Sequence, residues 1–189
     1  MANTDSRYGL RPVRYISGAP HCGETNEYDI DGSSNSTKIY WGDPVKPTAG
    51  GYIVQAAGGD TNIVGVFQGC EYTDEDGKRV WNKYWPGNTN LSNVKAFVAD
   101  HPDLVFNVQA DDNTTPTQAT LNANADFAIG TGSSNTGRSG AYLDTSSIVT
   151  GAANLRIMRL VPMEENEMGD FADFEVLINE HAYKTTSGT

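Results

Sequence analysis

The sequence is short of positive charge. It contains 13 lysine and arginine residues against 24 aspartate and glutamate residues, so its formal net charge is −11 over 189 residues. A protein that binds nucleic acid needs a basic surface to neutralise phosphate groups. The charge balance therefore argues against nucleic acid as a partner.

Long apolar stretches are also missing. The sequence has no run of 18 apolar residues, whereas a membrane-spanning helix needs about 20. Its first residues lack the charged and then apolar pattern of a secretion signal. We therefore expect neither a membrane partner nor secretion.

Cysteine is scarce. Cys22 and Cys70 are the two cysteines, and neither lies in a CxxC motif or beside a pair of histidines, so a zinc site is not indicated. Two cysteines do not make a disulfide framework. We expect free thiols buried as small apolar residues, and a Cys22–Cys70 disulfide stays open as the other interpretation.

Residues that favour long helices are few. Hydrophobic residues make up 38% of the chain, whereas Gly, Asn, Ser and Thr together account for 66 of the 189 residues, a composition that favours strands and turns. One helical turn is predicted at 118–123. The strands are predicted at 37–41, 52–56, 62–72, 78–84, 94–99, 104–108, 125–129, 141–143, 154–161 and 174–178. Short strands at this spacing predict an all-β fold, a single β-sandwich or barrel-like domain over 21–189.

Residues 1–20 differ from the rest of the chain. They carry three of the 13 basic residues, interleaved with aromatic and branched apolar residues, and Asp5 is their one acid. Pro12 disfavours a helix. The segment is thus predicted to be an extended N-terminal arm that becomes ordered on an acidic or carbonyl-rich partner surface. A disordered terminus is the alternative.

No catalytic set is apparent. The three histidines (His21, His101 and His181) are far apart and lie in no metal-binding motif. An oxygen-rich stretch resembles a calcium loop only loosely, because it lacks the glycine and the final glutamate of that loop; it consists of Asp29, Asp31, Ser33 and Asn35. Solvated turns explain it better, although bound calcium stays open. We expect no cofactor, no metal and no enzymatic activity.

Three aromatic residues lie close together in the sequence, namely Trp81, Tyr84 and Trp85. An exposed aromatic cluster can stack on sugar rings, but the same residues can fill the core of a sandwich. Trp85 precedes a Pro-Gly turn, so it is the member of the cluster that we expect to be partly exposed.

The string ANTDSRYGLRPVRYISGAP at 2–20 resembles the N-terminus of the head decoration, or cement, proteins of tailed bacteriophages. Weaker blocks extend the resemblance over most of the chain: GDPVK, NIVGVFQG, VADHPDLVFNVQ, LRIMRLV and INEH. The resemblance implies an all-β homotrimer, made in the host cytoplasm, on the outer capsid surface of the virion. There it would bridge neighbouring copies of the major capsid protein and stabilise the head.

On this interpretation the N-terminal arm faces the capsid. The residues assigned to that contact are Arg7, Tyr8, Leu10, Arg11, Pro12, Arg14 and Tyr15. Two other classes remain open. One is a carbohydrate-binding fibre or spike component that holds a host surface glycan with Trp81, Tyr84 and Trp85. The other is a glycosidase, which needs two carboxylates in one cleft.

Overall fold

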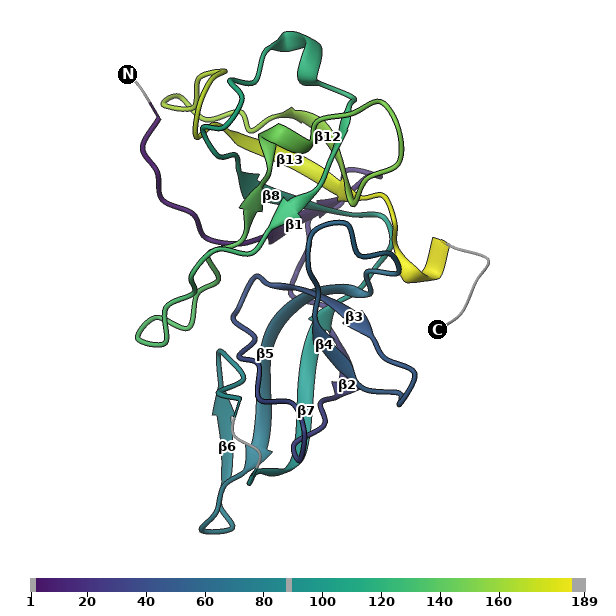
Figure 1. The fold of residues 1–189 in the computed structure, drawn as a ribbon, viewed down its shortest axis with the longest axis vertical. Coiled ribbons are helices and arrows are strands. Elements are labelled where there is room, and N and C mark those ends of the chain that lie inside the picture. Colours follow the sequence, from purple (N-terminus) through teal and green to yellow (C-terminus); the bar gives the residue numbers. More distant parts are fainter. Residues whose placement is uncertain (1–2, 88–89, 185–189) are drawn as a thin grey trace.

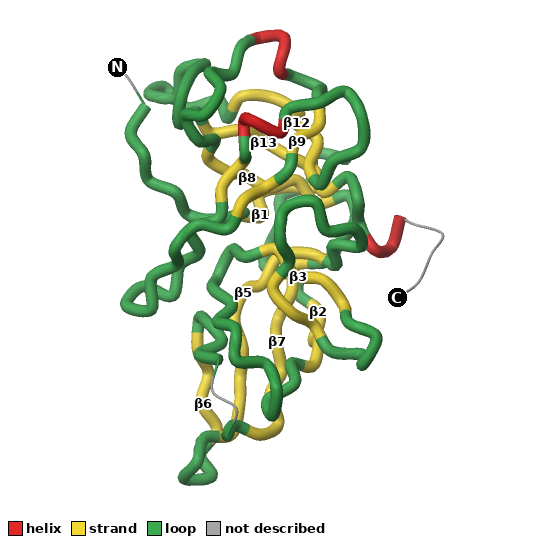
Figure 2. The backbone as a smooth tube through the Cα atoms, viewed as in Figure 1, coloured by secondary structure: helices red, strands yellow, loops and turns green. Residues whose placement is uncertain are grey.

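The computed structural model describes residues 3–87 and 90–184. Short strands form several antiparallel sheets that pack together, and Figures 1 and 2 show them arranged in an upper and a lower lobe. The helices of the described residues are single 3₁₀ turns, at Gln118–Thr120 (η1), Thr145–Ser147 (η2) and Ala182–Lys184 (η3). The predicted all-β, sandwich-like fold is confirmed.

The upper lobe is built on a five-stranded antiparallel sheet with strand order β1-β8-β13-β12-β9. Its strands are β1 (Arg11–Tyr15), β8 (Leu104–Gln109), β13 (Asp173–Ile178), β12 (Leu155–Leu160) and β9 (Asn124–Ala125). A two-stranded sheet of β10 (Phe127–Ala128) and β11 (Tyr142–Leu143) accompanies it. The first strand of the chain therefore forms an edge of a sheet whose other strands come from residues 104 onward.

The lower lobe contains a six-stranded sheet with the order β2-β7-β5-β3-β4, to which β6 is added by pairing with β5. Its strands are β2 (Asn26–Asp29), β7 (Ser92–Ala99), β5 (Gly65–Thr73), β3 (Pro44–Pro47), β4 (Ile53–Gln55) and β6 (Arg79–Asn82). β5 and β6 form a hairpin around the turn at Asp74, whose carboxylate accepts the Lys78 backbone N–H at 2.7 Å. Gly77 adopts a φ of 77° in that turn, which costs glycine little.

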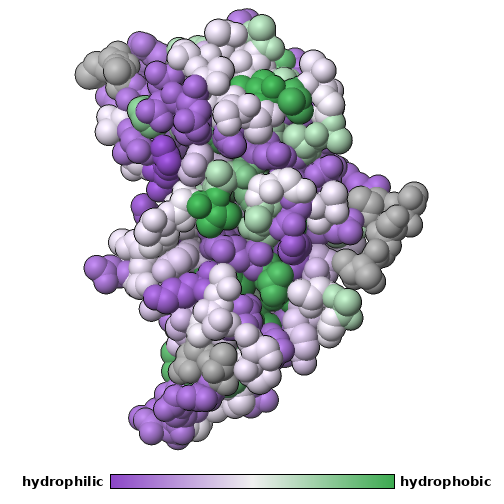
Figure 3. All heavy atoms as spheres, in the orientation of Figure 1, coloured by the Kyte–Doolittle hydropathy of each residue, from purple (hydrophilic) through white to green (hydrophobic). Residues whose placement is uncertain are grey.

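The buried apolar side chains form two clusters. The larger cluster includes Phe106, Phe127 and Phe174 of the upper lobe and extends to Val66 and Ala99 of the lower sheet. The other cluster lies within the lower lobe and includes Phe67 and Trp85. On the face shown in Figure 3, apolar atoms form small separate groups within a mostly hydrophilic surface. The apolar residues are thus used to fill two interiors.

Two strands of the lower sheet differ from the sequence predictions. β2 and β3 lie where no strand is predicted, and β3 begins and ends with proline. The strand predicted at 37–41 is reduced to isolated bridges of Ile39 with Trp85 and of Trp41 with Arg138. Most of the other predicted strands are present, and η1 occupies the predicted helical turn.

The segment that follows β13 is joined to the segment that precedes β5 by backbone hydrogen bonds. Ile63 N–H donates to the Glu180 carbonyl at 3.0 Å, and Ala182 N–H donates to the Ile63 carbonyl at 2.8 Å. Between them lies His181, which is 1% exposed and whose Nδ1 accepts the Tyr183 N–H at 3.1 Å. Burial, aided by the charge of Lys184, lowers the pKa of His181 to about 4, although Asp100 acts in the opposite direction.

The two cysteines are free in the structure. Cys22 is exposed and Cys70 is buried, so the expectation of free thiols is confirmed and the expected burial of Cys22 is wrong. Cys22 lies in the irregular segment between β1 and β2, where little packs over it, whereas Cys70 is in the centre of β5. Burial raises the pKa of the Cys70 thiol to about 12.

We predict that a thiol reagent such as DTNB modifies one cysteine quickly in the native protein and the second only on unfolding. Cys22 is accessible to the reagent. Cys70 is buried, and its raised pKa keeps it in the protonated thiol form, which is not the nucleophile. The measurement is the number of thiols titrated at pH 8 with and without urea. Cys22→Ser should abolish the fast phase and Cys70→Ala the slow one. Two equally fast thiols would contradict the prediction.

His181 predicts a loss of stability in mild acid. Its folded pKa is lowered to about 4, so the stabilisation is complete above the unfolded pKa near 6.5 and falls as the pH drops from there toward 4. We expect a loss of about 2 kcal/mol between pH 7 and pH 5 from this residue. Urea unfolding at both pH values measures it. His181→Gln should remove most of the drop, whereas His101→Gln should leave most of it in place, because His101 makes only the smallest contribution to the lowered pKa of His181. An equal drop in wild type and His181→Gln would rule this out.

Candidate binding surface

The N-terminal segment is anchored along the upper lobe of its own chain. β1 pairs with β8, with Arg11 opposite Asn107 and Tyr15 opposite Leu104. Before β1, Ser6 N–H donates to Gln109 Oε1 at 2.7 Å. The described residues 3–20 are therefore not a separate arm, and the boundary proposed at residue 20 does not divide two units. β1 supplies the edge of the sheet, which explains why the segment is rich in apolar residues.

Leu10 lies inside the protein. Its side chain is 1% exposed and belongs to the larger apolar cluster. The backbone holds it there, because Leu10 N–H donates to the Gly42 carbonyl at 2.9 Å and Gly9 N–H donates to the Ala141 carbonyl at 3.1 Å. Gly9 has a φ of 79°, and a Cβ there would lie 2.7 Å from the Gly42 carbonyl oxygen. The assignment of Leu10 to a partner-facing surface is wrong.

Arg14 is occupied by an internal ion pair. Its Nη2 lies 2.5 Å from Glu175 Oε2, and Arg159 Nη2 lies 2.7 Å from the other carboxylate oxygen. Burial acts to raise the pKa of Glu175, but hydrogen bonds and charges from the two arginines outweigh it and hold that pKa below its usual range. Arg14 thus fixes β1 onto β13. The neighbouring Pro12 and Tyr15 are half-buried.

Arg7 is also engaged within the chain. Its Nε lies 3.2 Å from Asp5 Oδ1, and its guanidinium carbon lies 4.1 Å from the centre of the Tyr142 ring. The side chain is 27% exposed. Arg7 therefore offers a partner only part of its guanidinium group.

Arg11 differs from the other two arginines of the segment. Its side chain is exposed, and it has no carboxylate at ion-pair distance in the part of the chain that the structure describes. The guanidinium carbon lies 4.9 Å from the Tyr8 ring centre and 5.7 Å from the Trp41 ring centre. Two aromatic faces thus orient the cation through cation–π contacts while leaving its N–H donors available.

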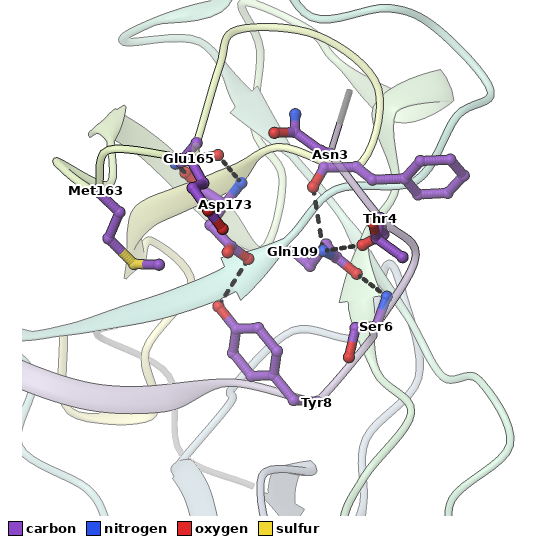
Figure 4. Close-up of a pocket in the computed structure, with 10 residues that line it drawn as sticks. Asn3, Thr4, Ser6, Tyr8, Gln109, Met163, Glu165 and Asp173 are labelled. Atoms are coloured by element: carbon purple, nitrogen blue, oxygen red, sulfur yellow. Dashed lines mark hydrogen bonds between the residues drawn. The ribbon is translucent and has the colours of Figure 1, made fainter. Parts of the chain in front are cut away.

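Tyr8 also borders an open cavity of about 360 Å³ between the N-terminal segment and the 163–173 connector. In Figure 4 its hydroxyl points at Asp173, and the Tyr8 Oη to Asp173 Oδ1 distance is 2.9 Å. Burial raises the pKa of both Tyr8 and Asp173. Gln109 closes one wall by donating to the carbonyls of Thr4 and Phe171, each at 3.1 Å. The polar groups of Tyr8, Asp173 and Gln109 are thus hydrogen-bonded within the protein. The bond to Asp173 fixes the position of the Tyr8 ring.

Trp41 is held in place by a buried carboxylate. Asp43, 1% exposed, accepts Tyr40 N–H at 2.7 Å and Gln55 Nε2–H at 2.6 Å, and it accepts the Ser139 hydroxyl as well. Burial raises its pKa against the lowering effect of these bonds. Asp43 therefore ties the lower sheet to the 131–140 loop, which pairs with the backbone of Trp41.

The three aromatic residues proposed for sugar binding are not brought together. Trp85 is fully buried, and its Nε1–H donates to the Asn35 carbonyl at 3.0 Å. The expected exposure of Trp85 is wrong, because its ring fills the core of the lower lobe beside Tyr72. Trp81 is 59% exposed on β6, and Tyr84 stacks on Tyr40 at 5.5 Å. The three side chains do not form one sugar platform.

The suspected calcium loop closes on itself. Asp31 Oδ1 accepts the backbone N–H of Ser33 at 2.9 Å and its hydroxyl at 2.6 Å. These bonds lower the pKa of Asp31. Among residues 3–87 and 90–184, no group of three or more His, Cys, Asp and Glu residues could hold a metal ion. In the same residues, no helix is long and apolar enough to cross a membrane.

Sequence reasoning located Arg11 and Tyr8 but not Trp41, the second ring that orients the guanidinium group. Trp41 lies 30 positions from Arg11 in the sequence, in a segment predicted only to be a strand. A usable signal was the absence of acidic residues around both positions, since no Asp or Glu occurs at 6–23 or at 32–42. Arg11 therefore has no carboxylate within five positions in the sequence.

Comparison with known proteins adds no relative: no family model, no curated protein and no solved structure matches this chain.

We predict that Leu10→Ala destabilises the protein, because it empties a fully buried site in the larger core. The expected loss is about 2–5 kcal/mol of unfolding free energy in urea. Arg11→Ala, one position away but exposed, should stay within about 0.5 kcal/mol of wild type. A chain that starts at Ile16 should not fold, because it lacks β1. Equal stability of Leu10→Ala and wild type would contradict the burial of this side chain.

Proposed function

We propose that this chain is a capsid decoration protein of a tailed bacteriophage, bound to the outer surface of the head. Its partner is the major capsid protein, and it assembles as a homotrimer that bridges neighbouring capsid subunits. The N-terminal string at 2–20 and the further blocks quoted above support this proposal through their resemblance to cement proteins.

The observation that carries the proposal is the state of Arg11. It is exposed, oriented by Tyr8 and Trp41, and without a carboxylate partner in the described chain. A guanidinium group in this setting can form a bidentate pair with a carboxylate of another protein. Since β1 is part of a sheet, Arg11 is presented rigidly and loses little conformational freedom on binding.

Attachment of this kind stabilises by linkage. A protein that binds the assembled shell, and not its separated subunits, shifts the equilibrium toward the shell. Three copies in one trimer raise the effective concentration of each contact, so weak single contacts add to firm attachment. No catalytic chemistry is needed for this role, and we propose none.

The test is co-sedimentation of the purified protein with heads of the source virus that lack it. Arg11→Ala should weaken binding about tenfold or more, as for a central interface arginine. Arg79→Ala is the matched control, because Arg79 is also exposed but is already paired with Glu71. Wild-type protein that does not sediment with the heads would remove the capsid assignment. Equal loss for Arg11→Ala and Arg79→Ala would remove the special role of Arg11.

A further inference from the structure

The cations of this acidic chain fall into two groups. Most are paired: Arg7, Arg14, Lys46, Lys78, Arg79, Lys95, Arg159 and Lys184 each have a carboxylate at ion-pair distance. Within the described residues, the cations without such a carboxylate are Arg11, Lys38, Lys83, Arg138 and Arg156. Arg156 donates to Asn124 on the neighbouring strand at 3.1 Å. All five are exposed, and the other four share one part of the surface.

These four cations gather around one loop, residues 131–140, the green loop at the left of Figure 1 where the two lobes meet. Arg138 belongs to the loop. Lys38 Nζ reaches the Ser134 hydroxyl at 3.4 Å. Lys83 packs against Gly137, since a Cβ built on that glycine would lie 2.7 Å from the Lys83 Cβ.

Arg11 lies beside the 131–140 loop because Trp41 contacts both of them. The Arg11 guanidinium carbon lies 5.7 Å from the Trp41 ring centre. The backbone of Trp41 is hydrogen-bonded to the loop on both sides, from Trp41 N–H to the Gly137 carbonyl and from Ser139 N–H to the Trp41 carbonyl, each at 2.9 Å. We call Arg11, Lys38, Lys83 and Arg138, with the rings of Tyr40 and Trp41, the loop face.

Aromatic rings support the loop face. The Tyr40 ring stacks on the Tyr84 ring, with 5.5 Å between the ring centres. The Tyr40 hydroxyl lies 3.1 Å from the Ser134 hydroxyl. A Cβ on Gly132 would lie 2.3 Å from the Tyr40 ring, so the loop backbone rests directly on this ring. Tyr40 and Trp41 are only half-buried. The loop face thus combines cations with rigid, partly exposed rings, a composition enriched in protein interfaces.

The segments that form the loop face contain no acidic residue. They are 6–23, 32–42, 80–87 and 127–143, which hold six of the 13 basic residues and none of the 24 acidic ones. Two carboxylates, Asp43 and Asp173, interact directly with residues of this surface. Asp43 is buried and hydrogen-bonded, and Asp173 is bonded to Tyr8 and interacts with Arg11 only through its charge. A positive surface therefore stands on a chain whose net charge is −11.

We propose that the loop face is a docking surface for a protein surface that presents several carboxylates. The inference rests on the proposed function for the identity of that partner, the outward face of the capsid, and it places the contact on residues 38, 83 and 138 in addition to Arg11. Charge complementarity selects the partner's chemistry. Four cations suffice for a carboxylate cluster, whereas the surrounding acidic chain repels a continuous phosphate backbone.

The experiment uses charge reversals in the full chain. Lys38→Glu, Lys83→Glu and Arg138→Glu are made singly and together, and Lys78→Glu is the matched control because Lys78 is exposed at the distant β5–β6 turn. Circular dichroism and thermal unfolding confirm that each variant folds. Binding to heads that lack the protein is measured by co-sedimentation. Binding to immobilised poly-L-glutamate and to an immobilised DNA duplex is measured by retention. Each assay is run at low and at moderate salt.

We expect wild type to bind the heads and poly-L-glutamate, with binding that falls as salt rises. Each single reversal should weaken both by about tenfold, the triple variant should lose both, and Lys78→Glu should change neither. If wild type binds the heads and the triple variant binds them equally, the inference is wrong and the proposed function stands. If wild type fails on heads but binds poly-L-glutamate through the loop face, the proposed function is wrong and the face stands.

The remaining outcomes overturn the inference. Binding of the DNA duplex with the same dependence on the three residues would make the partner a nucleic acid. If the triple variant alone, with no binding partner added, differs from wild type in oligomeric state, the partner of the loop face would be a second copy of this chain. Failure of wild type on heads and on poly-L-glutamate would end both proposals.

Discussion

The buried carboxylate of Asp43 is the constraint on which the exposed surface depends. It accepts donors from Tyr40, Gln55 and Ser139, which belong to three separate parts of the chain. A buried carboxylate is costly unless its oxygens are hydrogen-bonded, so these three parts are obliged to meet. Because Ser139 lies beside Arg138 and Tyr40 beside Trp41, the same bonds fix the aromatic and basic side chains that point outward.

A second buried carboxylate has the same effect within the upper lobe. Glu175 of β13, which is 4% exposed, forms ion pairs with Arg14 of β1 and Arg159 of β12. The first strand of the chain is thereby fixed to strands near its end. Arginines that a sequence offers for binding a partner can thus be used for folding, and Arg14 is used in that way whereas Arg11 is not.

The sequence predicted the fold class because strand signals are local. Apolar and β-branched residues in 62–72, 94–99 and 104–108 correctly marked the strands of both lobes. It did not predict β3, because Pro44 and Pro47 argue against a strand when the pairing partners are unknown. The burial of Leu10 and of Trp85 depends on residues far away in the sequence, such as Gly42 and Asn35. Of the cations in the proposed loop face, only Arg11 was predicted, because Lys38, Lys83 and Arg138 are brought near it only by contacts between distant parts of the chain.

The order of strands along the chain also determines when each lobe can form during synthesis. The lower sheet draws all its strands from residues 26–99, whereas the upper sheet needs β1 from the start of the chain and β12 and β13 from its end. Contacts of large sequence separation form late, since the cost of closing long loops precedes their reward. The lower sheet can therefore close while the ribosome is still producing the rest of the chain. β1 must wait, unpaired, until β8 has emerged, and its sheet is completed only when β12 and β13 follow.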